Sequence, residues 1–254
     1  MKKLLAILLG AIICINLLVS VNAERFFVCT DDHADFDVSV IEDWYSEASD
    51  FVRNYNLIFD VLVYADNYLY NDRPFDYYYD FCGNRDVTRS EVAMMLSMYN
   101  CSITIPWDLH RYSVETWYTD PENPTFVDVP NGMLYTSTAQ WAYDNGIVNG
   151  VGGAYFAPDR TITREEFATM LYRYTNYLEV DTSARADFSA FADGDSVSVW
   201  ATDAMSWAVA EGLISGKPGD LLAPKDTITR AEVAVIVYRY NNEVKAHRDI
   251  LDGN

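Results

Sequence analysis

Trp141–Tyr174 reads WAYDNGIVNGVGGAYFAPDRTITREEFATMLYRY, and Trp207–Tyr240 reads WAVAEGLISGKPGDLLAPKDTITRAEVAVIVYRY. The two stretches align without a gap at an offset of 66, and 16 of their 34 positions are identical. Such repetition indicates a fold built from copies of one small unit, each of which needs its neighbours to bury its apolar face. Duplicated units that lack a catalytic constellation are typical of binding proteins.

Each copy is predicted to form a helix, a tight loop and a second helix. Spacings of i, i+4, i+7 and i+8 predict a first helix over Ser198–Glu211 with one apolar face, made of Trp200, Ala204, Trp207 and Ala208. Gly212, like Gly146 in the other copy, is placed to end this helix in a left-handed conformation. The loop that follows has two glycines and a proline at matching positions of the two copies: Gly150, Gly153 and Pro158, or Gly216, Gly219 and Pro224.

The second helix opens with a threonine followed three residues later by a glutamate. This pattern is a capping box, in which each side chain accepts a hydrogen bond from the other residue's backbone amide. The pairs are Thr163 with Glu166 and Thr229 with Glu232. Apolar residues then recur at i, i+4, i+7 and i+11, which predicts a core-facing stripe: Phe167, Leu171, Tyr174 and Leu178, or Val233, Val237, Tyr240 and Val244.

A more divergent copy lies upstream. Thr88 and Glu91 repeat the capping box, and Val92, Leu96 and Tyr99 repeat the stripe. This copy carries an insertion at about residues 60–85, which contains six tyrosines: Tyr64, Tyr68, Tyr70, Tyr77, Tyr78 and Tyr79. We therefore expect repeat 1 at 30–101, a linker at 102–123, repeat 2 at 124–179, repeat 3 at 187–244 and a polar tail at 245–254.

Residues 1–23 are expected to be a signal peptide. A basic start and an apolar run lead to the small-x-small site Val21-Asn22-Ala23. An uncleaved membrane anchor is the alternative, but no basic stop-transfer flank follows, so we expect no transmembrane anchor after cleavage. The net charge of −20 at pH 7 disfavours nucleic acid, which proteins bind by neutralising phosphates with cations.

The cysteines and histidines are too scattered to form a metal site, so no metal or cofactor is predicted. An exported protein can form disulfides. Cys82 and Cys101 flank one predicted helix and are the first candidate pair, with Cys29–Cys82 as the alternative.

Together these motifs resemble the S-layer homology (SLH) repeat. They are Phe-x-Asp at 126–128 and 191–193, a tryptophan-containing helix, Gly-Ile-Val-x-Gly or Gly-Leu-Ile-x-Gly, Ala-Pro and Ile-Thr-Arg-x-Glu. The resemblance implies an all-α, pseudo-threefold assembly of three helix-loop-helix repeats, with a central helical bundle and three prongs. It also implies a protein secreted to the bacterial cell surface or cell wall, which binds secondary cell-wall polysaccharide, often pyruvylated, in grooves between repeats.

The arginines of the Thr-Arg-x-Glu motif are the candidate ligand contacts: Arg89, Arg164 and Arg230. Each begins a helix, where backbone amides and the helix dipole favour an anion. A guanidinium can hold a carboxylate by two parallel hydrogen bonds. Pairing with a nearby acidic side chain is the alternative, and the sequence alone rates the two equally.

Trp141, Trp207, Gly150 and Gly216 complete the predicted polysaccharide site. The spacing of the tryptophans favours the core, whereas the resemblance places a tryptophan in the groove. The glycines suit the backbone geometry of the loop, and they would also let a ligand approach closely. In repeat 1 the loop glycine is replaced by Asp60, so a groove that depends on this loop is expected to be altered.

The predicted function is a non-catalytic cell-wall anchor. The alternative is a structural surface-layer or protein-interaction component that docks another surface protein through the tyrosine-rich insertion. Catalysis is disfavoured because no Gly-x-Ser-x-Gly or His-Glu metal motif is present. Asp193 could imitate a glycosidase carboxylate, but it falls on the Phe-x-Asp position, where a helix-capping role suffices.

Overall fold

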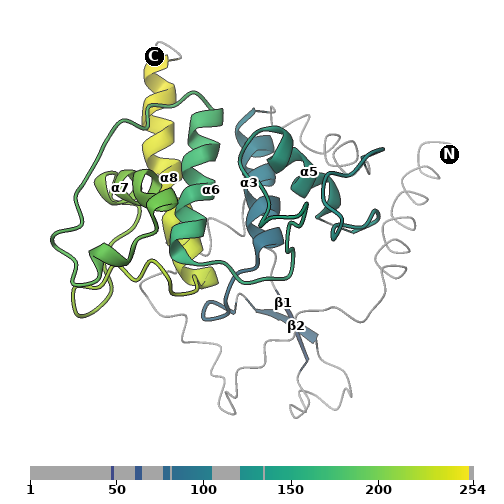
Figure 1. The fold of residues 1–254 in the computed structure, drawn as a ribbon, viewed down its shortest axis with the longest axis horizontal. Helices are drawn as coiled ribbons and strands as arrows, with labels where there is room; N and C mark the ends of the chain where they lie inside the picture. The colour runs from purple at the N-terminus through teal and green to yellow at the C-terminus, as the bar shows by residue number, and fades with distance from the viewer. Residues whose placement is uncertain are drawn as a thin grey trace, which may run out of the picture. The chain divides into compact units, whose positions relative to one another are not determined.

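The computed structural model describes residues 47–48, 61–64, 77–80, 82–104, 121–133 and 135–251. The helical body within these ranges has five α-helices (Figure 1): α3 (Arg89–Thr104), α5 (Thr136–Asp144), α6 (Arg164–Tyr177), α7 (Thr202–Ala210) and α8 (Arg230–Leu251). Two 3-10 turns, η2 (Gly194–Ser196) and η3 (Val199–Ala201), precede α7. The predicted all-α class is confirmed for this body.

Some predictions fall outside the described residues. They include the signal peptide at 1–23, residues 105–120 of the linker at 102–123 and the side chain of Cys101, so the Cys82–Cys101 disulfide stays a prediction. Cys82 itself is buried. Across the described ranges, no helix is both long and apolar enough to cross a membrane.

The insertion in repeat 1 contains a short antiparallel hairpin. It consists of β1 (Val61–Tyr64) and β2 (Tyr77–Asp80), with Val61 opposite Asp80 and Tyr64 opposite Tyr77. The hairpin belongs to a compact part of the chain separate from the helical body. Strands were not predicted here, although valine and tyrosine are residues that strands favour.

The second helices of the three repeats, α3, α6 and α8, meet along their apolar stripes (Figure 1). Tyr99, Tyr174 and Tyr240 contribute one ring each to their meeting point. The ring centroids are 6.2 Å apart for Tyr99 and Tyr174, 5.9 Å for Tyr99 and Tyr240, and 6.4 Å for Tyr174 and Tyr240. The core-facing role of these stripe positions is confirmed, because all three tyrosines are buried.

The extended segments that precede these helices in the sequence are joined by backbone hydrogen bonds in a closed ring. Val87 N donates to Ile228 O (3.0 Å), Ile228 N to Ile162 O (3.1 Å), and Ile162 N to Val87 O (3.1 Å). Each repeat therefore contacts both others through its backbone. A complete pseudo-threefold assembly with three prongs stays a prediction, because most of the first helix of repeat 1 lies outside the described residues.

The first helix of a repeat packs on the second helix of the preceding repeat: α5 packs against α3, and α7 against α6. Both first helices end as predicted. Gly146 and Gly212 have φ of 70° and 66°, and each lies in a Schellman turn. In these turns Ile147 N donates to Ala142 O (2.8 Å) and Leu213 N to Ala208 O (2.9 Å).

One helix boundary was predicted incorrectly. Helix α7 begins at Thr202 rather than Ser198, and Trp200 lies in the preceding turn η3. The side chain of Trp200 is 56% exposed, whereas Ala204 and Trp207 are buried. The expectation that Trp200 shares their face is wrong, because a 3-10 turn has about 3.0 residues per turn and breaks the 3.6-residue periodicity.

Candidate functional site at the repeat junctions

Each motif arginine begins the second helix of one repeat and contacts another repeat. Arg89 Nε donates to Phe156 O in repeat 2 (2.8 Å), and Arg164 Nε donates to Leu222 O in repeat 3 (3.2 Å). Arg230 Nη1 lies 3.6 Å from a carboxylate oxygen of Glu91 in repeat 1. The three residues are 6%, 4% and 2% exposed. The structure thus places the predicted arginines at three separate junctions between repeats.

The first amides of the second helices hold the junctions together. Arg89 N donates to Arg160 O (2.9 Å) and Ser90 N to Pro158 O (3.0 Å). At the next junction, Arg164 N donates to Asp226 O (3.0 Å) and Glu165 N to Pro224 O (3.1 Å). The expectation that these amides assist anion binding is therefore wrong for these four, since each already has a backbone acceptor.

All three second helices have the reciprocal hydrogen bonds of a capping box. Thr163 N donates to Glu166 (3.0 Å), and Glu166 N donates to the Thr163 hydroxyl (3.3 Å). The distances are 2.8 and 3.4 Å for Thr88 with Glu91, and 3.1 and 3.3 Å for Thr229 with Glu232. Each glutamate also pairs with an arginine: Glu91 with Arg85, Glu166 with Arg160 and Glu232 with Arg164.

The aspartate of Phe-x-Asp clamps the loop of its own repeat. Asp193 accepts hydrogen bonds from Leu222 N (2.7 Å) and Ala223 N (2.8 Å), and Ala223 has φ of 52°. Asp128 binds Phe156 N and Ala157 N in the same way, at 2.8 and 2.7 Å. The helix-capping role suggested for Asp193 is wrong, because its side chain caps no helix.

The clamp lowers the pKa of Asp193. Desolvation alone would raise this pKa, but the hydrogen bonds from the two backbone amides outweigh it. The lowered pKa favours the ionised carboxylate, which is the form that accepts both amide hydrogen bonds.

Gly150 and Gly216 are required by close packing in the loops. A Cβ on Gly150 would lie 2.7 Å from Tyr155 O, and its φ of +76° is unfavourable for other residues. A Cβ on Gly216 would lie 2.9 Å from the ring of Phe191. A Cβ at either position would clash with the phenylalanine or the loop backbone of the same repeat. This supports the prediction that the glycines suit the backbone geometry of the loop.

The predicted tryptophans lie in or against the core. Trp207 is 2% exposed, and its ring packs against Tyr172 (centroids 5.5 Å apart) and Tyr240 (6.5 Å). Trp141 is partly buried and packs against Tyr174 (6.3 Å). The helical spacing that favoured a core position for both residues agrees with these contacts.

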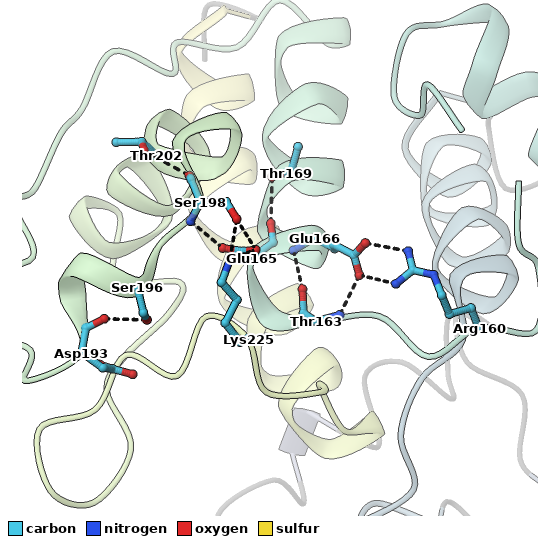
Figure 2. A network of polar contacts seen from close by, with 10 residues as sticks. All are labelled: Arg160, Thr163, Glu165, Glu166, Thr169, Asp193, Ser196, Ser198, Thr202 and Lys225. Carbon is cyan, nitrogen blue, oxygen red and sulfur yellow. Dashed lines mark hydrogen bonds and ion pairs between the residues drawn. The ribbon is translucent and has the colours of Figure 1, made fainter. Parts of the chain in front are cut away.

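A polar network at the junction of repeats 2 and 3 was missed from the sequence (Figure 2). Glu165 is buried and accepts hydrogen bonds from Ser198 N and Oγ (both 2.9 Å) and from Lys225 Nζ (2.6 Å). Repeat 3 has Ala231 at the position of Glu165. This difference between the copies was the only hint in the sequence that Glu165 has a special role, but it does not identify Ser198 and Lys225 as its partners.

The family comparison matches the S-layer homology domain at residues 125–168 and 190–234. An exoglucanase, XynX, of Acetivibrio thermocellus is 33% identical over 160 residues, which cover 61% of this chain and 13% of that protein. The surface-layer 125 kDa protein of Lysinibacillus sphaericus is 34% identical over 48% of this chain and 10% of its own length. A cellulosome-anchoring protein of A. thermocellus is 28% identical over 45% of this chain and 25% of its own length.

The shared part is thus a small fraction of each relative, in an enzyme as well as in surface proteins. The match covers repeats 2 and 3, and a third copy at 30–101 stays a prediction. By this match, the chain carries two S-layer homology domains, one in repeat 2 and one in repeat 3.

Proposed function

We propose that this chain is a non-catalytic module that anchors to the bacterial cell wall by binding secondary cell-wall polysaccharide, with pyruvylated sugars as the ligand class. The SLH match supports a role in cell-surface anchoring, as do relatives named as surface-layer and cellulosome-anchoring proteins. The relatives named as enzymes share only a small part of their length with this chain, which supports a binding role for that part.

The observation that carries the proposal is the position of the arginines at the junctions between repeats. Arg89 and Arg164 extend from one repeat to the loop of the next. A guanidinium recognises a carboxylate by charge and by parallel hydrogen bonds, and a ketal-linked pyruvate presents a carboxylate on a sugar ring. The net charge of −20 repels an anionic polymer, but salt screens that repulsion beyond about 8 Å.

An exposed aromatic residue stands beside one of these junctions. Tyr155 is exposed and immediately precedes Phe156, whose carbonyl accepts from Arg89. An aromatic ring can cover the apolar face of a sugar while its hydroxyl stays in water. A charged donor next to an exposed ring suits a glycan that carries an acidic substituent.

Co-sedimentation of the protein with purified cell-wall sacculi tests the proposal. The protein is mixed with intact sacculi and with sacculi stripped of secondary polysaccharide. We expect it to pellet with the first and to stay in the supernatant with the second. Equal binding to both would refute polysaccharide recognition and would indicate peptidoglycan or a protein as the partner.

A further inference from the structure

Repeat 2 carries an apolar patch on the surface of its loop. Four large apolar side chains, each between 40% and 68% exposed, lie on this loop and on two segments beside it: Val127, Tyr143, Val151 and Tyr155. Together they expose roughly 400 Å², and a patch of that size on a monomer is often functional. These four residues are called the repeat 2 patch below.

Two backbone hydrogen bonds hold three of the four residues close together. Val127 N donates to Ala154 O (3.0 Å), and Val151 N donates to Tyr155 O (2.8 Å). The loop at 150–156 therefore carries Val151 and Tyr155 next to the segment that contains Val127.

Tyr143 reaches the same loop from α5. Its ring lies nearly perpendicular to that of the buried Phe126, with the centroids 5.3 Å apart. A Cβ on Gly150 would lie 3.0 Å from the same Phe126 ring. Asp128 fixes the far end of the loop by accepting two backbone hydrogen bonds. The patch is thus held in place by the protein itself, and a preformed surface loses little conformational freedom when a ligand binds.

The loop that carries the patch has no charged side chain. Residues 145–158 contain no Asp, Glu, Lys or Arg, in a chain whose net charge is −20. The matching loop of repeat 3 has Lys217 at the position of Val151 and Asp220 at the position of Ala154. The uncharged aromatic surface is therefore a property of repeat 2, and the motif that the two repeats share does not require it.

The size and chemistry of the patch favour a glycan over a protein as its ligand. A stable protein interface covers about 800 Å² on each partner, which is about twice the area of the patch. Sugar rings are smaller, and an aromatic side chain can cover the apolar face of a sugar while its hydroxyl stays in water. Residues 145–158 offer no cation to an acidic group. Uncharged sugars are therefore the ligand class that fits this surface.

A polar side chain suited to sugar hydroxyls lies beside the patch. Asn149 is exposed and stands two residues before Val151. No hydrogen bond joins its side-chain amide to the part of the chain that the structure describes. An amide both donates and accepts hydrogen bonds, as a sugar hydroxyl does, so Asn149 can orient a sugar that packs on the apolar side chains.

We propose that the repeat 2 patch, together with Asn149, is a binding site for uncharged pyranose rings of a wall glycan. The site uses none of the junction arginines, although Tyr155 adjoins one of the junctions. The inference rests on the proposed function, because attachment to the wall brings such sugars to the patch. The sugars belong either to the secondary polysaccharide or to the glycan strands of peptidoglycan.

Isothermal titration of the protein with uncharged glycans tests this site. One probe is wall polysaccharide from which ketals have been removed by mild acid and in which uronic acids have been reduced. The other probe is chitohexaose, an uncharged mimic of the peptidoglycan strand. We expect the unmodified protein to bind at least one of them, and the probe that binds identifies the source of the sugars.

The residues of repeat 3 provide the test variants, because they occupy the same loop positions in the same fold. Val151→Lys and Tyr155→Leu introduce the residues found at positions 217 and 221. Each should weaken binding to the uncharged probe about three- to tenfold, as expected for loss of one apolar or aromatic contact. Tyr177→Leu is the matched control, because Tyr177 is similarly exposed outside the patch, and it should change binding less than about twofold.

Equal losses for Tyr155→Leu and Tyr177→Leu, or unchanged binding by both patch variants, would overturn the site. The inference also fails if the unmodified protein binds untreated wall polysaccharide but neither uncharged probe, and that result would leave wall anchoring through acidic sugars intact. Failure to bind the untreated polysaccharide would instead refute the proposed function, whatever the result with chitohexaose.

Discussion

Removing the Asp193 carboxylate tests how the loop of repeat 3 is held in place. Two backbone amides, Leu222 N and Ala223 N, depend on it, and both of these residues are buried. Each hydrogen bond to a charged group contributes about 1.5–3 kcal/mol. Because water reaches the half-buried carboxylate, the lower values apply, and we expect Asp193→Ala to cost about 3 kcal/mol of unfolding free energy.

Urea unfolding followed by tryptophan fluorescence measures this loss. Asp195→Ala is the matched control, because Asp195 is an exposed acid in the same turn and its replacement changes the charge equally. Asp193→Asn should lose at least half of the stabilisation, since its amide retains one acceptor and directs a donor at the other N–H. A loss below about 1 kcal/mol for Asp193→Ala, or one matched by Asp195→Ala, would refute the clamp.

The contribution of Asp193 should also depend on pH. Its pKa in the folded protein is lowered from the ordinary value of 3.8, so the carboxylate stabilises the folded state fully above that ordinary value. The stabilisation disappears as the pH falls through the lowered folded-state pKa. The difference in stability between the unmodified protein and Asp193→Ala should therefore be constant near neutral pH and shrink in strong acid.

Three other substitutions test the packing of the loop and core and the capping of α6 through their effect on stability. Gly150→Ala should lower the melting temperature more than Gly146→Ala. Both glycines have positive φ, but only at Gly150 would a Cβ clash with backbone atoms. Equal losses would contradict the close contact with Tyr155 O. Trp207→Phe should lower the unfolding free energy by less than about 1.5 kcal/mol, because the buried indole nitrogen has no hydrogen-bond partner that the variant would lose. Trp207→Ala should lower it by about 3–5 kcal/mol, because it removes a large buried side chain. A Phe variant as unstable as the Ala variant would contradict the absence of a hydrogen bond at this nitrogen. Thr163→Ala should cost about 1 kcal/mol in urea unfolding through loss of the capping box, and Thr202→Ala, at an exposed position in α7, is its control.

The parts of the fold that depend on local periodicity were predictable from the sequence. The stripe through Phe167, Leu171 and Tyr174 is buried as its spacing predicts. Trp200 shows the limit of this reasoning, because periodicity assumes a continuous helix and the chain forms a 3-10 turn there. The clamp by Asp193 joins residues 29 and 30 positions apart, a contact that spacing along one helix does not predict.

The residue types of the candidate site were predictable from the sequence, but the partners of these residues were not. Arg89 and Arg164 stand in the same motif and were predicted to have the same role. The structure gives the capping-box glutamates beside them different partners, because Glu232 pairs with Arg164 whereas Glu166 pairs with Arg160. The sequence contains all of these residues, but only the contacts between repeats show which arginine each glutamate meets.

The ring of hydrogen bonds through Val87, Ile162 and Ile228 sets this chain apart from open repeat arrays. In a linear array each copy contacts only its neighbours, and the two end copies must be capped by polar faces. Here the segments that precede α3, α6 and α8 bond to one another in a closed ring, so each of these three segments has both of its partners within the chain. A fourth segment could enter this ring only if one of its hydrogen bonds were broken, and removal of one segment would leave a backbone donor and an acceptor of the other two unpaired. Closure of the ring therefore limits it to three segments, and further copies of the motif would have to form a ring of their own.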